Sequence, residues 1–434
     1  MLIYYIRKAT KNMSNNPEKI PSDSASTKLK SIRGQLSLVS WTLYDIGNTM
    51  FNAGVVGLFF PLWLKEKGGG GDSDLGFTIA ICLSLVIFLS PIIGVISDQI
   101  KSRLPILTLF SLLAGSSILL LGFTSDLSNG RFLFSIGFFS VYIAELIYNS
   151  LLTDITEKEN RGRIGGAAIG IGYTGVLVVV AMGLYLEGNN SNYSAGFIGI
   201  SICYFLTSLP VSFLLIEKPK LTSNITSVFR AILEAWSNVI MLTRTVTKDP
   251  DITKLLIGRY LYMASILTAS SFAVFFGIET IGFSAEQVQY VLLLGVIFAI
   301  PGSIIWGNLV DKIGAKRTLI IVLIGWSLVL SGTIAIPIFN LDSRLWWVLT
   351  ILMGTLYGGV WAADRPLLIS LSETQVGGLF GLYAITSRTA YLTGAFAWPF
   401  IANVLGFGQV AAVTFLVFCG IAGLLFIQRI KRIA

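Results

Sequence analysis

The chain has 434 residues, of which 54% are hydrophobic and only 12% charged, whereas a soluble globular protein carries about 25% charged residues. It contains no histidine, which excludes histidine-based proton relays and metal sites, and its three cysteines lie within apolar runs, so we expect no disulfide framework, metal or cofactor. The net charge of +8 would suggest nucleic acid in a soluble protein, but the basic residues gather in loops between apolar runs, and we expect no such partner.

The chain begins with a polar, basic segment, residues 1–35, which we predict to be a disordered cytoplasmic tail. Beyond it, apolar residues occur in runs of about 20, the length of a helix that crosses a bilayer. These runs predict an all-α polytopic membrane protein with twelve transmembrane helices. The predicted spans are 36–64, 77–97, 104–123, 132–153, 164–187, 195–216, 254–279, 287–310, 317–338, 345–370, 377–404 and 407–428.

The long central loop, residues 217–253, divides the spans into two groups. We expect an N-terminal six-helix bundle at 36–216, a C-terminal six-helix bundle at 254–428 and a basic cytoplasmic tail at 429–434. Apolar residues at helical spacing in the central loop, among them Trp236, predict an amphipathic helix. It would lie either on the membrane surface or against the protein itself.

Glycine and basic residues distinguish the remaining loops. Residues 65–76 include the run Gly68–Gly71, which predicts a flexible linker. The loops on the same side as this linker hold only four basic residues: Lys65, Lys67, Arg131 and Arg344. All other loop lysines and arginines fall on the side that carries both ends of the chain, so the positive-inside rule places both termini in the cytoplasm.

An acidic-then-basic hinge occurs twice, after the second and the eighth predicted spans. The two copies run Gly94-Val-Ile-Ser-Asp98-Gln-Ile-Lys101-Ser-Arg103 and Gly307-Asn-Leu-Val-Asp311-Lys312-Ile-Gly314-Ala-Lys316-Arg317. A second pair of matching segments, beginning at Leu151 and Leu367, recurs at nearly the same offset and in the same direction. We therefore expect two parallel repeats related by an axis along the membrane normal.

The hinges lie on the predicted cytoplasmic side, where they would form a gate. Asp98 and Asp311 would each cap a helix N-terminus in the other half, near Gly377-Gly378 and Gly165-Gly166 respectively. Whether or not the hinges form a gate, their basic residues also help to keep these loops on the cytoplasmic side. The proposed gating residues are Gly94, Asp98, Arg103, Gly307, Asp311, Gly314 and Arg317.

Charged residues inside the spans are the candidates for solute chemistry, because a mid-helix Asp or Arg costs roughly 2.5–3.5 kcal/mol on the insertion scale. Of these residues only Arg388 lies outside the first helix of a group of three spans. The first helices, spans 1, 4, 7 and 10, are therefore predicted to line a polar cavity; they hold Asp45, Glu145, Arg259, Asp364 and Arg365. The alternative is a set of ion pairs that only hold helices together. With their polar neighbours, the candidate cavity residues are Tyr44, Asp45, Asn48, Glu145, Tyr148, Asn149, Arg259, Tyr262, Asp364, Arg365 and Arg388.

The hinge, the spans, the repeat and the long central loop together resemble the major facilitator superfamily over residues 36–428. The first hinge has Lys101 near the place of the family's middle glycine. Trp41-Thr-Leu-Tyr44-Asp45-Ile-Gly-Asn48-Thr-Met-Phe51 resembles the W-x-L-Y-D-x-x-N-x-x-F motif of the vacuole-effluxer-like branch. The resemblance implies alternating access and, from the eukaryotic branch, efflux of amino-acid-like solutes. Asp364 departs from the small or polar residue of that branch.

These observations predict a monomeric secondary transporter, not an enzyme, that moves a small polar or zwitterionic solute. Proton coupling through Asp45 or Glu145 is a further hypothesis. A membrane-embedded enzyme is disfavoured, since the sequence has no metal-ligand cluster and no G-x-S-x-G motif. A passive facilitator and a non-transporting receptor or scaffold are the alternatives left open. The membrane would be the inner membrane of a bacterium or else an organellar one.

Overall fold

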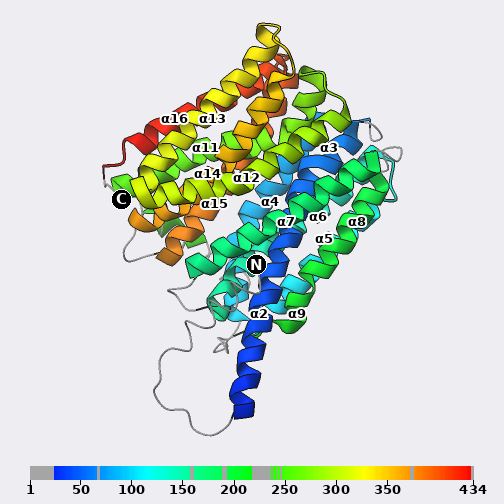
Figure 1. Ribbon diagram of the computed structural model, residues 1–434. Helices are drawn as coiled ribbons and strands as arrows, with labels where there is room; N and C mark the ends of the chain where they lie inside the picture. The colour runs from blue at the N-terminus through cyan, green and yellow to red at the C-terminus, as the bar shows by residue number, and fades with distance from the viewer. Residues whose placement is uncertain are drawn as a thin grey trace.

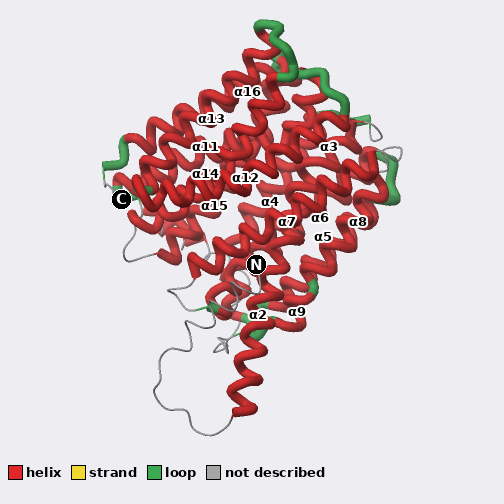
Figure 2. The backbone as a smooth tube through the Cα atoms, in the orientation of Figure 1, coloured by secondary structure: helices red, strands yellow, loops and turns green. Residues whose placement is uncertain are grey.

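The computed structural model describes residues 24–65, 69–156, 161–187, 193–217, 236–237, 239–241, 243–244, 247–371 and 376–431. Throughout these ranges the regular structure is helical (Figures 1 and 2). In the N-terminal half the helices are α2 (Ser24–Met50), continued by the π-helix η1 (Phe51–Phe59) and α3 (Phe60–Trp63), then α4 (Asp72–Gln99), α5 (Leu104–Leu121), α6 (Leu127–Ile155), α7 (Arg161–Glu187), α8 (Tyr193–Ser208) and α9 (Pro210–Leu214). In the C-terminal half they are α11 (Pro250–Phe275) with η4 (Phe276–Thr280), α12 (Ala285–Ile313), α13 (Ala315–Ile338), α14 (Leu345–Leu371), α15 (Val376–Pro399) with η5 (Phe400–Val404), and α16 (Gly408–Gln428).

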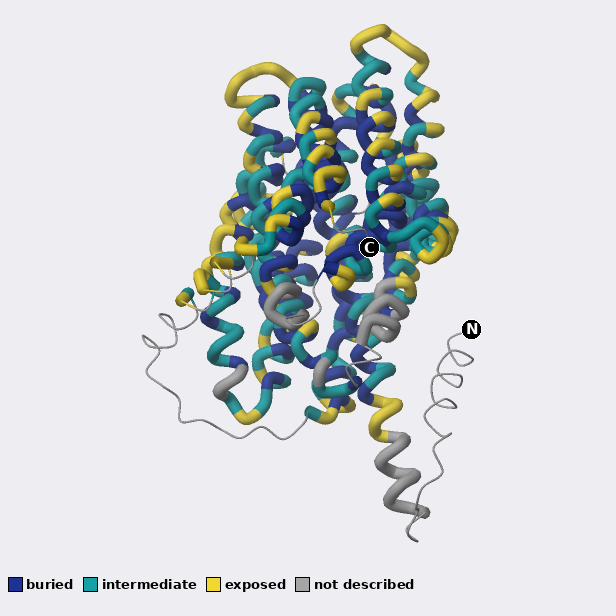
Figure 3. Tube along the Cα trace, turned by 90° about the vertical axis from the view of Figure 1, so that its left-hand side faces the viewer, coloured by how far each residue is buried: buried dark blue, intermediate teal, exposed yellow. Residues whose placement is uncertain are grey.

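Each predicted span coincides with helix in the structure. Within the described residues, nine helical segments are long and apolar enough to cross a membrane, and Gly170–Leu186 is a shorter apolar one. Large apolar side chains on their outer surfaces, such as Phe213 and Leu206, are strongly exposed, as expected where lipid replaces water. Figure 3 shows buried positions on the inward-facing turns and exposed ones along the outside. The predicted all-α membrane fold is therefore confirmed.

Two helices begin inside segments predicted to be disordered or flexible. Helix α2 starts at Ser24, inside the segment expected to be a disordered tail, and the sequence has no proline or glycine between Ser24 and Gly34 to interrupt it. Helix α4 starts at Asp72, inside the expected flexible linker. Its first turn carries two acids that favour a helix N-terminus, and the Asp74 carboxylate accepts a hydrogen bond from the Gly71 backbone at 2.9 Å.

The helix ends form two faces. The basic face holds the turns near residues 100 and 314, the described ends of α6 and α14 near residues 155 and 371, and both described ends of the chain. At this face Lys431 N donates to the Asp251 carboxylate of α11, and Arg103 N donates to Glu217 at 2.8 Å. The opposite face holds the turns near residues 124, 283, 342 and 406.

The two halves meet along a few helices. Helix α4 packs beside α15, and α7 beside α12, while η1 and α3 contact α11 (Figure 1). The predicted linker helix lies mostly outside the described residues. At its described end Trp236 lies 5.8 Å, ring centroid to ring centroid, from Phe88 of α4, so here the linker contacts the protein.

Candidate functional site

One charged pair is sealed inside the C-terminal half. Arg259 of α11 forms an ion pair with Asp364 of α14, and both are at most 1% exposed. The hydroxyls of Tyr262 and Tyr383 donate to the two Asp364 carboxylate oxygens at 2.7 and 2.8 Å. Arg259 Nη2 also donates to Ser387 Oγ at 2.7 Å. Every partner belongs to α11, α14 or α15, so this pair joins three helices of one half.

A second arginine joins the two halves. Arg388 of α15 donates from Nη1 to Ser90 Oγ of α4 at 2.9 Å and from Nη2 to the Tyr142 carbonyl of α6 at 3.3 Å. Its Nη2 lies 3.8 Å from the Glu145 carboxylate, a looser contact than a hydrogen bond. The Glu145 side chain is 31% exposed and that of Arg388 10%. This pair thus lies where the halves meet, and its carboxylate is partly exposed.

Asp45 of α2 lies beside the same place. A Cβ at Gly172 of α7 would come within 2.8 Å of Asp45 Oδ2, so the missing side chain lets the carboxylate lie against α7. Asp45 is within electrostatic reach of Glu145 and of Arg365 from α14. Two carboxylates of the N-terminal half therefore face two guanidinium groups of the C-terminal half.

The motif in α2 places two aromatic side chains next to Asp45, and both pack on α6. The Trp41 and Tyr44 rings stack on Tyr148 of α6, with centroids 4.7 and 4.6 Å apart. Trp41 Nε1 donates to the Tyr148 carbonyl at 3.1 Å. Tyr44 and Trp41 are one helical turn apart, so both reach the same partner. The stack fixes α2 against α6 and hence Asp45 near Glu145.

The amide candidates differ from one another. Asn48, one turn beyond Asp45, is buried, and its Oδ1 accepts no hydrogen bond from the described residues. Its backbone carbonyl accepts from Asn52 Nδ2 at 2.9 Å. Asn149 is exposed. Asn48 is therefore the more suitable of the two predicted amides for binding a buried ligand.

Several tyrosines near the charged groups were missed by reasoning from the sequence. Tyr142 lies in the electrostatic surroundings of Glu145 and Arg388 and stacks on Phe138 with centroids 4.5 Å apart. The others are Tyr173, Tyr357 and Tyr391. These side chains carry no charge, and tyrosines at helical spacing usually indicate ordinary packing.

The predicted gating residues lie at the basic face, but with different roles. Around Gly94 and Gly307, no described atom lies within 4 Å of the position a Cβ would take. Gly314 has φ 88° where α12 ends, a conformation that favours glycine. Asp311 and Arg317 are exposed.

Arg103 differs from the other proposed gating residues because it is buried within the N-terminal half. It lies 3.9 Å from Asp154 and donates to the Ser150 carbonyl. The side chain of Asp98 and the glycines expected beside the two hinge acids lie outside the described side chains.

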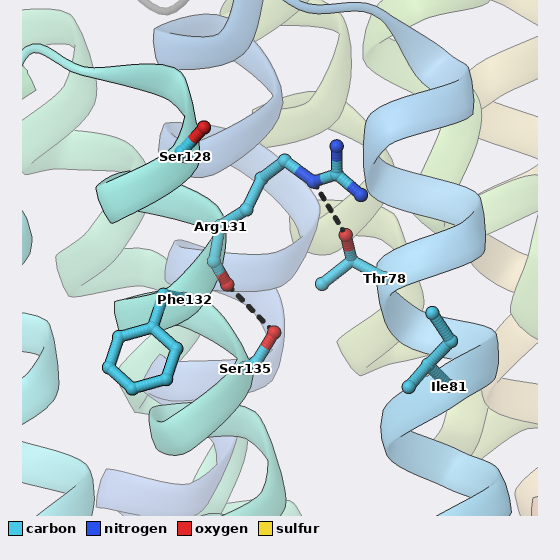
Figure 4. Close-up of a pocket in the computed structure, with 6 residues that line it drawn as sticks. All are labelled: Thr78, Ile81, Ser128, Arg131, Phe132 and Ser135. Carbon is cyan, nitrogen blue, oxygen red and sulfur yellow. Dashed lines mark hydrogen bonds between the residues drawn. The ribbon is translucent and has the colours of Figure 1, made fainter.

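A small pocket of about 270 Å³ lies away from these groups, between α4 and α6 near the opposite face (Figure 4). Its lining residues are Thr78, Ile81, Ser128, Arg131, Phe132 and Ser135. The Arg131 guanidinium is already bound, by Asp74 at 2.9 Å and by Thr78 Oγ at 3.2 Å. Ile81 and Phe132 are 60% and 65% exposed. The pocket opens to the outside of one half and is not the candidate site.

Comparisons with known proteins agree with the fold. Residues 152–432 match the family described as vacuole effluxer Atg22 like, and residues 1–180 match the Major Facilitator Superfamily. The chain is 21% identical over 398 residues to the MFS-type transporter YxiO of Bacillus subtilis, covering 87% of this chain and 91% of that protein. It is 26% identical over 279 residues to autophagy-related protein 22 of Pichia angusta, covering 55% and 50%.

Solved transporter structures share the arrangement of helices. A D-xylose-proton symporter superposes with a TM-score of 0.66 at 15% identity, covering 92% of this chain and 97% of that one. A point mutant of the nucleoside transporter NupG superposes with a TM-score of 0.68 at 9% identity, covering 92% and 100%. At these identities the likeness concerns the fold alone.

Proposed function

Because this chain belongs to the vacuole effluxer Atg22-like family and has the fold of major facilitator transporters, we propose that it is a secondary active transporter for a small zwitterionic or polar solute. It is an integral membrane protein with transporter relatives. Alternating access, efflux and proton coupling are the finer parts of the proposal. Both termini would face the cytoplasm, as the basic loops indicate.

The observation that carries the proposal is the contact of Arg388 with Ser90, Tyr142 and Glu145 of the other half. A solute carboxylate is a better partner for this guanidinium than a carboxylate 3.8 Å away, because charge-assisted hydrogen bonds need about 2.7–2.9 Å. A solute ammonium would then pair with Glu145 or Asp45. Binding would thus exchange a contact between the halves for contacts through the solute.

This exchange suggests how binding and movement are linked. Arg388 holds α15 to α4 and α6 in this structure. A solute that takes over the guanidinium weakens that connection, and the halves can then rock about the bound molecule. The sealed Arg259–Asp364 pair takes no part in this exchange, because the Asp364 carboxylate oxygens already accept hydrogen bonds from the same half.

The test is counterflow of zwitterionic and neutral solutes in proteoliposomes, with candidates chosen by thermal shift of the purified protein. Arg388→Ala should reduce counterflow of a zwitterionic solute at least tenfold, and Arg388→Lys should restore part of it. Arg344→Ala, at an exposed position on the opposite face, is the matched control. Unchanged counterflow in Arg388→Ala would contradict the assignment of the site.

Accumulation against a gradient separates the active transporter from a passive facilitator. An imposed proton gradient should drive accumulation of the solute identified by counterflow. Equilibration without accumulation would indicate a facilitator. Binding without counterflow would indicate a receptor on the same fold.

A further inference from the structure

A buried carboxylate at the opposite face connects the two halves. Asp72, in the first turn of α4, is 5% exposed. Its Oδ2 accepts hydrogen bonds from Trp398 Nε1 at 2.9 Å and from Gln409 Nε2 at 3.2 Å, and its Oδ1 accepts one from Asn403 Nδ2. All three donors belong to the C-terminal half, on α15, η5 and α16. The carboxylate thus joins α4 to three elements across the interface.

The contacts continue from Asp72 to an ion pair between the halves. Gln409 Nε2 also donates to Glu279 Oε2 of η4 at 2.6 Å, and Thr280 Oγ1 donates to Gln409 Oε1 at 2.7 Å. Glu279 in turn pairs with Lys65 of the N-terminal half at 2.6 Å. The Lys65 and Glu279 side chains are 39% and 30% exposed, so this pair contributes little by itself. Asp72 is the buried centre of the network.

Glycines along the helices between the halves show where the halves lie close together. A Cβ at Gly76 of α4 would lie 2.5 Å from the Ala395 carbonyl of α15, and a Cβ at Gly183 of α7 would lie 2.5 Å from Gln289 Oε1 of α12. Toward the basic face, by contrast, a Cβ at Gly94 or Gly307 would meet no described atom within 4 Å. The structure is thus closed at the opposite face, and among the described residues α4 and α12 have no close neighbour at these two glycines.

We propose that Asp72 is the positioning residue that holds the opposite face closed while the basic face is open. The proposal rests on alternating access. If the halves separate at this face, the Asp72 carboxylate must lose its three donors from the C-terminal half and take water in their place. Trp398 is held ready by stacking on Phe272, with centroids 4.8 Å apart, so its N–H is oriented before the contact forms. Asp72 therefore sets the ratio of the two conformations without touching the solute.

The experiment measures that ratio directly in the full-length protein. Spin labels at Ser125→Cys and Leu341→Cys, exposed on the opposite face in different halves, report the distance between the halves in a background without the native cysteines. In Asp72→Asn the side chain has one acceptor oxygen in place of two, and its NH₂ group would face side chains that themselves donate hydrogen bonds. We expect the ratio of long to short distances to rise about tenfold, because hydrogen bonds to charged groups are strong.

Two further variants test whether the effect belongs to the contacts. Trp398→Phe keeps the stack on Phe272 but removes the N–H, and it should shift the ratio in the same direction, with less than additive effect in the Asp72→Asn background. Asp126→Asn removes a carboxylate at the start of α6 on the same face, and it should leave the distances unchanged. In the structure this carboxylate accepts a hydrogen bond from Asn129 N of its own half at 2.8 Å.

The outcomes separate this proposal from the transport function. An unchanged distance distribution in folded Asp72→Asn protein would overturn the role of Asp72, as would an equal shift in Asp126→Asn. A shifted distribution in a protein that fails every counterflow assay would support Asp72 and refute the transport proposal instead.

Discussion

At the residue scale, two arginine–acid pairs of similar composition have opposite environments. Arg259 and Asp364 are sealed in one half, where they form an ion pair and hydrogen-bond to Ser387 and Tyr262. Arg388 and Glu145 are partly exposed and loosely paired between halves. Burial removes the first pair from exchange with a ligand, whereas the second can exchange its partner. In the proposed function, the first pair is therefore structural and the second binds the solute.

Removing the acid of the sealed pair should destabilise the protein. Asp364→Asn leaves the Arg259 guanidinium buried without a counter-charge, and we expect a loss of about 3–5 kcal/mol in the free energy of unfolding. In detergent, the loss of stability should appear as a lower midpoint of thermal unfolding for Asp364→Asn than for the unaltered protein. The double variant Arg259→Met/Asp364→Leu should recover much of the loss, because it removes both charges. A midpoint for Asp364→Asn equal to that of the unaltered protein would contradict this account.

Glu145 is the residue at which proton coupling should first be tested. Glu145→Gln preserves the shape of the side chain but cannot take up a proton. We expect solute counterflow to persist while accumulation driven by a proton gradient is lost. Asn149→Asp, one turn away at an exposed position, adds a titratable group without replacing this one and is expected to retain coupling. Accumulation by Glu145→Gln at the normal level would exclude Glu145 as the coupling site.

The sequence identified the charged residues but could not pair them. Arg259 and Asp364 lie in different spans, and their contact depends on the rotation of two helices that amphipathic pattern does not determine in an apolar environment. The motif Trp41 to Phe51 carried the family resemblance, yet the stack of Trp41 and Tyr44 on Tyr148 depends on a helix that lies far along the chain. Neutral members of the site, Ser90 and Tyr142, carried no sequence signal.

At the element scale, span positions followed from hydropathy, but helix ends and helix type did not. The π-helical segments η1, η4 and η5 continue the first, seventh and eleventh spans toward the opposite face. Two of them carry residues of the Asp72 network, Glu279 and Asn403. A π-helical turn rotates the following side chains relative to an α-helix and has no distinct hydrophobic period. The flexible-linker prediction for 65–76 overlooked the acids that start α4.

The repeated hinge glycine offers a prediction for α12. A Cβ at Gly307 meets no described atom in this conformation, and a non-glycine residue removes the entropic cost of glycine in a helix interior, so Gly307→Leu should fold with unchanged or raised thermal stability. If the basic face must close during transport, the added side chain would obstruct that closure. We expect transport to fall at least tenfold.

The measurement combines counterflow with thermal unfolding for Gly307→Leu. Asn308→Leu, at the exposed neighbouring position, is the control for added bulk. Normal counterflow in Gly307→Leu would show that this glycine has no role in closing the basic face.

At the scale of the whole molecule, the duplicated hinge predicted two similar halves, and the helices superpose on those of solved transporters. The conformation could not be predicted, because hydropathy and repeats are the same in every state of an alternating-access cycle. The state is recorded in contacts between the halves, such as those of Asp72 and Gly76 at the opposite face. The same sequence must allow both conformations of the cycle, and the contacts of Asp72 and Gly76 favour the one described here.

The two faces should therefore act on one equilibrium with opposite sign. Asp72→Asn weakens closure of the opposite face, whereas Gly307→Leu hinders closure of the basic face and so favours the conformation described here. Because the two sites lie at opposite ends of the molecule and share no partner, their effects on the free energy should add. The double variant should show a distance distribution between those of the single variants.

The same spin-label pair at Ser125 and Leu341 measures all four proteins. A double variant that matches Asp72→Asn alone would mean that Gly307 does not influence the equilibrium, and the faces would then not be coupled in the proposed way. An intermediate distribution together with low counterflow would support coupling, because restoring the average ratio does not remove the bulk of Leu from the closing basic face. The ratio of the two conformations can thus be restored without restoring the rate of transport, because alternating access requires both faces to close in turn.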